Sequence, residues 1–263
     1  MHGIELISGD GLRLDIALHP TSFESARGPV LLVHGITVDL DEGGGMFVRL
    51  AERLAESGFD VVRFSFRGHG GSEGTQRGVT VAGECLDLEA AVTFTHDRYP
   101  GPMSIVAASF GAVSTLSTLS WLTEDLHRLV LWNPVLDLRR TFLEPELSWG
   151  VANFGASQQK RLRDSGFLRV DEEFELGRVL FHEFENYDPL DAFQNSTVPT
   201  LIVHGDRDTA VSYEIAAEAA RTRPATQLHT VTGSDHGFDS PDREAEAIEA
   251  TVAWLIDAPT TKP

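Results

Sequence analysis

Short apolar runs rich in β-branched residues recur along the chain, and they constrain its fold more than any other feature. Such runs occupy residues 30–33, 61–64, 104–107, 129–132 and 200–203. Because they are apolar at consecutive positions, they suit strands that are buried on both faces, as in a parallel sheet. The sequence therefore predicts a central, mostly parallel sheet.

Amphipathic helical patterns lie between these runs. The apolar stripes consist of Phe47, Leu50, Ala51 and Leu54, of Val81, Cys85, Leu88 and Val92, and of Ile248, Val252 and Leu255. Their spacing of three and four residues puts each stripe on one face of a helix. Strand and helix alternate, which predicts an α/β fold with helices flanking the sheet.

The segment 134–195 breaks this alternation. It mixes aromatic, basic and acidic positions and contains no clear buried strand. A connection of this length normally carries function or structure of its own. We therefore expect a core built from residues 1–133 and 196–263, with a cap inserted at 134–195. A chain of 263 residues is long enough for one such core.

The charge balance excludes several classes of partner. Lys and Arg number 21 against 40 Asp and Glu, giving a formal charge of -19. This charge repels nucleic acid and anionic membrane surfaces. No apolar run is long enough to span a membrane, and the first residues lack a basic region followed by an apolar core. We expect a soluble, cytoplasmic protein, while its oligomeric state is not readable.

Metal and disulfide chemistry is also not expected. Cys85 is the only cysteine, so neither an intramolecular disulfide nor a multi-thiolate site can form. The histidines are scattered without the spacing of zinc ligands. The glycine-rich loop 67–74 lacks the Gly-Lys-Ser/Thr ending of a phosphate loop, and we interpret it as a tight structural connection. The sequence predicts no metal and no cofactor.

The strongest chemical motif is Ala107-Ala108-Ser109-Phe110-Gly111, which joins an apolar run to a helix of small residues. A small-x-Ser-x-Gly pattern is typical of a nucleophile held in a sharp turn between strand and helix. Residues two positions from the serine are small because a larger side chain would collide with the neighbouring strand or helix. The usual first residue is Gly, and Ala107 adds one methyl group. The alternative is a serine that only caps the helix.

Two later loops offer an acid and a base. Asp206 and Asp208 follow the run 200–203, and His236 follows the strand pattern 227–232. The order Ser, Asp, His is that expected for a catalytic triad on this architecture. We favour Asp208 over Asp206 as the residue that orients His236, although either aspartate could instead cap the helix that begins near Val211.

The donors of an oxyanion hole are expected from backbone amides. His34 and Gly35 stand at the end of the run 30–33. An amide from this loop, for which we choose Ile36, and the amide of Phe110 would together stabilise a tetrahedral oxyanion. The alternative is a plain turn at the end of a strand.

These motifs resemble the α/β-hydrolase superfamily over nearly the whole chain. The matching segments are His34-Gly35, Phe66-Arg67-Gly68-His69-Gly70-Gly71-Ser72, the Ser109 turn, His204-Gly205-Asp206-Arg207-Asp208 and Asp235-His236-Gly237. Within the superfamily the core is similar to the cinnamoyl-esterase and serine-aminopeptidase-like groups. That resemblance implies a cap between the sixth strand and the later catalytic loops.

A second, patchier resemblance concerns the acyl-transferase/thioesterases of bacterial luminescence. It rests on Ala107-Ala108-Ser109 and on segments 135–141 and 176–183. It implies fatty-acyl release from a carrier thioester, and it makes Ala107 less unusual.

The sequence therefore predicts a serine hydrolase that cleaves a carboxylic ester or an acyl thioester through an acyl-enzyme on Ser109. One alternative is an acyltransferase or thioesterase acting on a carrier-bound acyl chain. The other is a binding module without catalytic activity. The leaving group, the acyl chain and the pathway are not readable.

The expected cap bears on the choice of partner. Its basic residues outnumber the acidic ones between positions 139 and 169; they are Arg139, Arg140, Lys160, Arg161, Arg163 and Arg169. One interpretation is a landing site for an anionic partner such as an acyl carrier protein or a coenzyme A thioester. The other is a solvated face with local ion pairs. The aromatic residues of the segment could line an acyl pocket or form a small core of their own.

Overall fold

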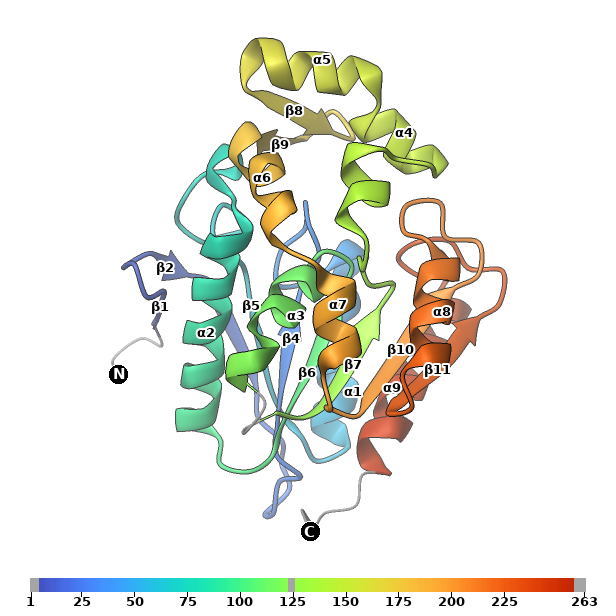
Figure 1. Ribbon diagram of the computed structural model, residues 1–263. Coiled ribbons are helices and arrows are strands. Elements are labelled where there is room, and N and C mark those ends of the chain that lie inside the picture. Colours follow the sequence, from blue (N-terminus) through green and yellow to red (C-terminus); the bar gives the residue numbers. More distant parts are fainter. Residues whose placement is uncertain (1–4, 123–125, 258–263) are drawn as a thin grey trace.

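The computed structural model describes residues 5–122 and 126–257 (Figure 1). Its centre is a seven-stranded sheet with the order β11-β10-β7-β6-β4-β5-β3. All neighbouring strands in it pair in parallel except β3, which pairs antiparallel with β5. Its strands are β3 (Ile16–His19), β4 (Pro29–Val33), β5 (Asp60–Phe64), β6 (Met103–Ala108), β7 (Leu126–Trp132), β10 (Thr200–Gly205) and β11 (Thr226–Val231).

The burial of the central strands explains their composition. Every residue of β4, β6 and β10 is buried, because helices cover both faces of the sheet. Consecutive apolar positions are therefore required there, and each of the five predicted runs lies within a strand of this sheet. The predicted α/β fold with a mostly parallel sheet is confirmed.

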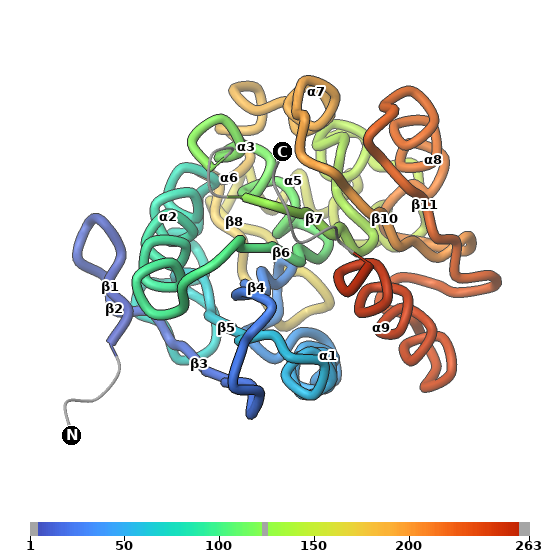
Figure 2. The backbone as a smooth tube through the Cα atoms, turned by 90° about the horizontal axis from the view of Figure 1, so that it is seen from below, coloured from blue at the N-terminus to red at the C-terminus, as the bar shows by residue number. Residues whose placement is uncertain are grey.

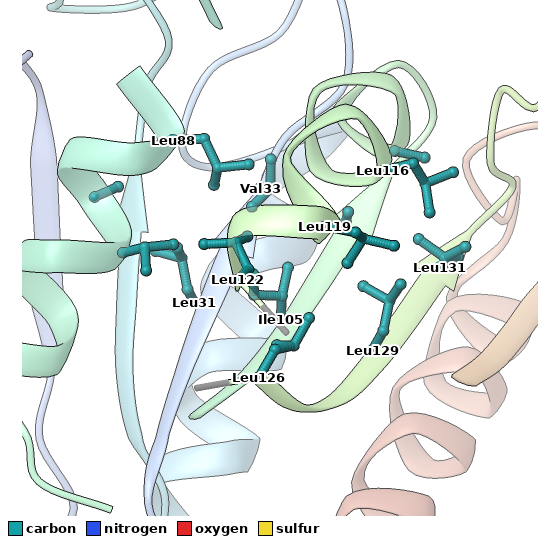
Figure 3. Close-up of a cluster of buried hydrophobic side chains, with 14 of the residues drawn as sticks. Leu31, Val33, Leu88, Ile105, Leu116, Leu119, Leu122, Leu126, Leu129 and Leu131 are labelled. Atoms are coloured by element: carbon teal, nitrogen blue, oxygen red, sulfur yellow. The ribbon is translucent and has the colours of Figure 1, made fainter. Parts of the chain in front are cut away.

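Two layers of helices enclose the sheet (Figure 2). One face carries α2 (Val81–Arg98), α3 (Gly111–Leu122), α7 (Pro189–Asn195) and α8 (Tyr213–Thr222), and the other carries α1 (Met46–Glu56) and α9 (Pro241–Ile256). Figure 3 shows Leu116 and Leu119 packed over Ile105 and Leu129 of the sheet. The four residues of the stripe predicted for α1 are fully buried.

The connection between β7 and β10 has structure of its own. It contains α4 (Ser148–Phe154), α5 (Ala156–Ser165), β8 (Phe167–Val170), β9 (Phe174–Gly177) and α6 (Arg178–Glu183). In Figure 1 these elements lie beyond one end of the sheet. The antiparallel hairpin of β8 and β9 was not expected from the sequence. Its strands have only four residues each, and their half-buried positions include Arg169 and Glu175, which form an ion pair.

The end of this connection returns to the core. Helix α7 lies beside α3 and α8 in Figure 1, and Phe193 is fully buried in the central apolar cluster. The segment expected as an insertion, 134–195, thus includes one helix that covers the sheet. The outermost residues of the expected core, 1–4 and 258–263, lie outside the described residues.

The remaining elements are short. They are the antiparallel pair β1 (Leu6–Ile7) and β2 (Arg13–Leu14), the 3-10 turns Gly43–Gly45, Gln76–Gly78 and Phe184–Asn186, and a π turn at Arg139–Leu143. The glycine-rich loop after β5 is anchored by Arg67, whose guanidinium forms ion pairs with Asp10 and Asp87. A Cβ at Gly68 would lie 2.7 Å from the Thr75 carbonyl oxygen, which fits the structural role expected for this loop.

Candidate active site

Ser109 occupies a sharp turn between β6 and α3. Its φ of 49° lies in the left-handed region, which is uncommon for a residue with a side chain. Its amide donates to the Trp132 carbonyl (2.8 Å) and its carbonyl accepts from the Val135 amide (3.1 Å). The end of β7 and the residues that follow it therefore stabilise the turn. A Cβ at Gly111 would lie 2.4 Å from the His34 carbonyl oxygen, so the turn requires glycine there.

The methyl group of Ala107 is accommodated in the sheet. Ala107 pairs with Val33 on one side and Leu131 on the other, and its side chain is fully buried in the central cluster. The departure from the usual glycine therefore adds an apolar contact.

Ser109, His236 and Asp208 lie in one hydrogen-bonded line. His236 Nε2 is 3.2 Å from Ser109 Oγ, and His236 Nδ1 is 2.8 Å from Asp208 Oδ2. Ser109 follows β6, Asp208 follows β10 and His236 follows β11, so all three stand at the carboxyl ends of parallel strands. The structure brings together the three side chains that the sequence selected.

The charges of this line are coupled. Burial alone would lower the pKa of His236, but the negative charge of Asp208 and its hydrogen bond outweigh burial and raise this pKa above its ordinary value. Burial alone would raise the pKa of Asp208, but the charge of His236 and the hydrogen bonds from His204 and His236 hold it well below its ordinary value. Asp208 is therefore a permanent carboxylate that favours the imidazolium form of His236.

Asp206, the alternative acid, has a different partner. Its Oδ1 accepts a hydrogen bond from the Gly233 amide at 2.6 Å, which ties the loop after β10 to the loop after β11. Asp235 adds a second tie: its Oδ1 accepts from the amides of Thr209 and His236, at 2.7 Å each. The sequence motif contains Asp235 as the neighbour of His236 but does not predict this role.

The loop after β4 presents the predicted oxyanion donors. The His34 imidazole is buried; its Nδ1 lies 2.7 Å from the Gly35 carbonyl oxygen and its Nε2 accepts from the Phe66 amide at 2.9 Å. A bare Nε2 requires the proton on Nδ1, so the imidazole donates to Gly35. Among residues 5–122 and 126–257, the amides of Ile36 and Phe110 donate to no protein acceptor.

Glu42 is a site residue that no sequence motif indicated. Its carboxylate accepts from the Gly35 amide at 2.7 Å and lines the same cavity as Ser109. Its backbone has φ 56° and ψ 167°, a region that residues with side chains rarely occupy. Burial raises the pKa of Glu42 above its ordinary value, against the opposing hydrogen bonds from the Gly35 and Gly43 amides.

A cavity of about 430 Å³ opens at Ser109. Its apolar lining includes Ile36, Val38, Met46, Trp132, Val135, Phe142, Trp149, Ala210, Val211 and Phe238. Three carboxylates also line it, those of Glu42, Asp171 and Asp235. Among the described residues, no Lys or Arg contributes to this wall. The cavity suits an apolar group without negative charge.

The segment 134–195 contributes few of its aromatic rings to this cavity. Phe142 and Trp149 line it. The others mostly pack on one another, together with Phe110 of the core; they include Phe154, Phe181 and Phe184. Phe174 instead stacks on His69 of the core. Of the two interpretations of these aromatic residues, a small local core describes most of them.

The basic residues of the same segment are largely paired. The ion pairs are Arg139–Glu144, Arg140–Glu146, Lys160–Asp164 and Arg169–Glu175. Arg161 lies over the ring of Phe167 at 5.3 Å. This arrangement matches the interpretation as a solvated face with local ion pairs.

Neither a cluster of metal-ligating side chains nor a membrane-spanning helix occurs in the part of the chain that the structure describes. No group of three or more His, Cys, Asp or Glu side chains there is arranged to hold a metal ion. No helix within those residues is both long and apolar enough to cross a bilayer.

Comparison with known proteins identifies the family. The model of the serine aminopeptidase family S33 matches residues 24–167, more than half of the chain, and that of the prolyl oligopeptidase family matches residues 100–260. No curated protein sequence matches significantly.

Solved structures share the fold at low sequence identity. Est1E from Butyrivibrio proteoclasticus with bound ferulic acid has a TM-score of 0.81 at 20% identity, covering 97% of this chain and 98% of that one. The mouse α/β hydrolase domain-containing protein 10 has a TM-score of 0.75 at 18% identity, covering 97% and 98%. An esterase from Exiguobacterium antarcticum has a TM-score of 0.71 at 18% identity, covering 96% and 99%. From the matched families and this shared fold, the chain belongs to the α/β-hydrolase superfamily.

Proposed function

We propose that the protein is a serine esterase in which Ser109 is the nucleophile, His236 the general base and Asp208 the residue that orients the base. The observation that carries this proposal is the continuous line from Ser109 Oγ to His236 (3.2 Å) and from His236 to Asp208 (2.8 Å) at the wall of an apolar cavity. Such an arrangement activates a hydroxyl that is otherwise a weak nucleophile.

The reaction follows from the positions of the protons. His236 Nε2 takes the proton of Ser109 Oγ while the oxygen attacks the acyl carbon, and Asp208 stabilises the imidazolium that forms. His236 then gives this proton to the leaving alcohol, and the acyl group stays on Ser109. A water molecule, deprotonated by His236, attacks the acyl-enzyme. His236 then returns this proton to Ser109 Oγ as the ester bond to Ser109 breaks, which releases the acid and regenerates the serine.

The negative charge on the carbonyl oxygen requires donors, which we assign to the amides of Ile36 and Phe110. The peptide group between Gly35 and Ile36 is trans, as is every described peptide bond, so its N–H points away from its C=O. The imidazole of His34 holds that C=O at 2.7 Å, which fixes the direction of the Ile36 N–H. Donors that are oriented before the reaction stabilise the transition state without reorganisation.

The acyl group that fits best is apolar and uncharged. The cavity beside Ser109 is lined by apolar side chains and by three carboxylates, which repel an anionic acyl group. Phe142 and Trp149 come from the segment 134–195, and we propose that this segment acts as a cap that selects the acyl group. Est1E, whose structure holds ferulic acid, suggests aromatic esters as the first substrates to test.

An acyl thioester would form the same acyl-enzyme on Ser109. The local pairing of the cap's basic residues gives no support to a carrier-protein landing site, so a free ester is the favoured substrate. The test is a matched panel of short alkyl esters, aryl esters, acyl thioesters and an aminoacyl anilide, compared by kcat/KM. We expect neutral esters to lead, and a preference of about a hundredfold for the thioester or the anilide would contradict the assignment.

A labelling experiment tests the nucleophile. A fluorophosphonate probe should modify Ser109 in the folded protein, and Ser109→Ala should abolish both labelling and turnover. Wild-type protein that is folded and yet not labelled would favour a binding module without catalytic activity. Labelling of Ser109→Ala would show that another nucleophile is used.

A further inference from the structure

A second imidazole reaches the carboxylate of Asp208. His204, the fifth residue of β10, has its Nε2 at 3.1 Å from Asp208 Oδ2, the same oxygen that lies 2.8 Å from His236 Nδ1. The side chains of His204 and Asp208 are both completely buried. Resting on the proposed function, we propose that His204 is a positioning residue: it shares Asp208 Oδ2 with His236 and so sets how strongly Asp208 acts on the catalytic base.

The hydrogen bonds of Asp208 account for both of its oxygens. Oδ1 accepts from the amides of Ala210 and Val211, at 2.8 Å each, and Oδ2 accepts from His204 and His236. A carboxylate has about four acceptor positions. With four donors the buried group is saturated, and its orientation is fixed from two sides.

The surroundings of His204 determine which of its nitrogens carries the proton. Nε2 must donate, because its partner is a carboxylate. Nδ1 is buried and has no hydrogen-bond partner among the described residues. A proton there would be a buried donor without an acceptor, which is unfavourable. The proton of His204 therefore lies on Nε2, and its ring is held edge-on against the ring of Tyr213 at 5.6 Å.

Because His204 and His236 share Asp208 Oδ2, the hydrogen bond from His204 affects the one from His236. A donor on Asp208 Oδ2 withdraws electron density that would otherwise strengthen the bond to His236 Nδ1–H. Removing that donor makes Asp208 a stronger acceptor, which favours the imidazolium form of His236 and moves its titration to higher pH. The other charged groups that act on His236 are Glu42 and Asp235, whose carboxylates accept hydrogen bonds from the amides of Gly35 and Thr209.

Two substitutions separate this role from packing. Gln reaches roughly as far as His Nε2 and keeps a donor, while Phe keeps a ring but has no donor. We expect His204→Phe to lower kcat/KM about tenfold or more, as loss of such supporting partners does, and to move the acid limb of the pH–kcat/KM profile upward by about half a pH unit. His204→Gln should restore the position of the limb and most of the rate.

The control is His229 on the neighbouring strand β11, which lies beside Val203 and pairs with Glu246 at the surface. His229→Phe should leave the limb in place. Equal profiles for His204→Phe and wild type, or equal impairment of His204→Gln and His204→Phe, would overturn the proposal.

A measurement on the wild-type chain keeps the proposal testable even where the Phe variant does not fold. In ¹⁵N-histidine NMR, His204 should carry its proton on Nε2, and an Nδ1–H tautomer would contradict the proposal. This readout does not depend on turnover. Failure of the proposed function would appear instead as absent fluorophosphonate labelling of wild-type Ser109.

Discussion

The backbone of Ser109 is held in a conformation that its side chain disfavours. At a φ of 49° a Cβ atom costs on the order of 1 kcal/mol. At ordinary positions a glycine variant is less stable than an alanine variant. Here we expect the free energy of unfolding of Ser109→Gly to equal that of Ser109→Ala or to exceed it by up to about 1 kcal/mol. Urea unfolding of the two variants measures the difference. If Ser109→Ala were clearly the more stable, the turn would carry no strain.

The pH dependence of the reaction follows from His236. The base must be neutral to accept a proton, and its pKa is raised above its ordinary value of about 6.5. Activity should therefore fall, as pH decreases, with a midpoint above pH ~6.5 in the profile of kcat/KM.

The matched pair of aspartates tests the origin of that shift. Asp208→Asn removes the charge, so the midpoint should move to lower pH and kcat/KM should fall by about 10³–10⁴. Asp206→Asn, which replaces the carboxylate that accepts from the Gly233 amide, should leave the midpoint in place and change kcat/KM by no more than a few fold. The opposite result would assign the acid to Asp206.

The sequence predicted the site residues whose roles follow from motifs. It did not predict the contacts that form only when distant parts of the chain fold together. Ser109 and Asp208 each follow a recognisable apolar run, and His236 follows the weaker strand pattern 227–232. Glu42 belongs to no motif and reaches Gly35 through an unusual backbone. His204 belongs to a matching segment, but the sequence does not show its contact with Asp208, which forms only after the loop turns back.

The spacing of apolar residues predicted the helices and strands that are buried on one face or on both faces. The central strands and the α1 stripe were predicted because the sheet and its helices demand consecutive or three-to-four spaced apolar residues. The hairpin of β8 and β9 was not, because each strand is short. Helix α7 was assigned to the inserted segment because sequence order alone does not show that Phe193 returns to the sheet.

Gly177 at the end of β9 lies where the hairpin meets a turn of the core. A Cβ on Gly177 would lie 1.9 Å from the Arg77 carbonyl oxygen, so the β9 end and the turn Gln76–Gly78 approach too closely for a side chain. We expect Gly177→Ala to destabilise the protein by about 2 kcal/mol or more, measured by thermal unfolding. Gly9→Ala, whose nearest contact would be 3.8 Å away, is the control and should be nearly neutral.

The negative charge of the whole molecule should disfavour anionic substrates. The chain carries a net charge of -19, and carboxylates line the cavity. An ester with an anionic acyl group should react more slowly than its neutral isostere, and its kcat/KM should rise several-fold as salt screens the repulsion, with the neutral ester unaffected. Rates at low and high ionic strength measure this. An anionic ester that is favoured at low salt would contradict the inference.

The end of β7 connects the two halves of the active site. Trp132 offers its carbonyl to the amide of Ser109, and Asn133 bonds Val203 and Gly205 of β10 through its own amide and side chain. Asp208 and His236 are joined to each other, and β7 lies between the strand that precedes Ser109 and the strand that precedes Asp208. The distance between Ser109 and His236 thus depends on the end of β7. Substitutions at positions 132 and 133 would change the rate by changing this distance, although the triad residues themselves remain.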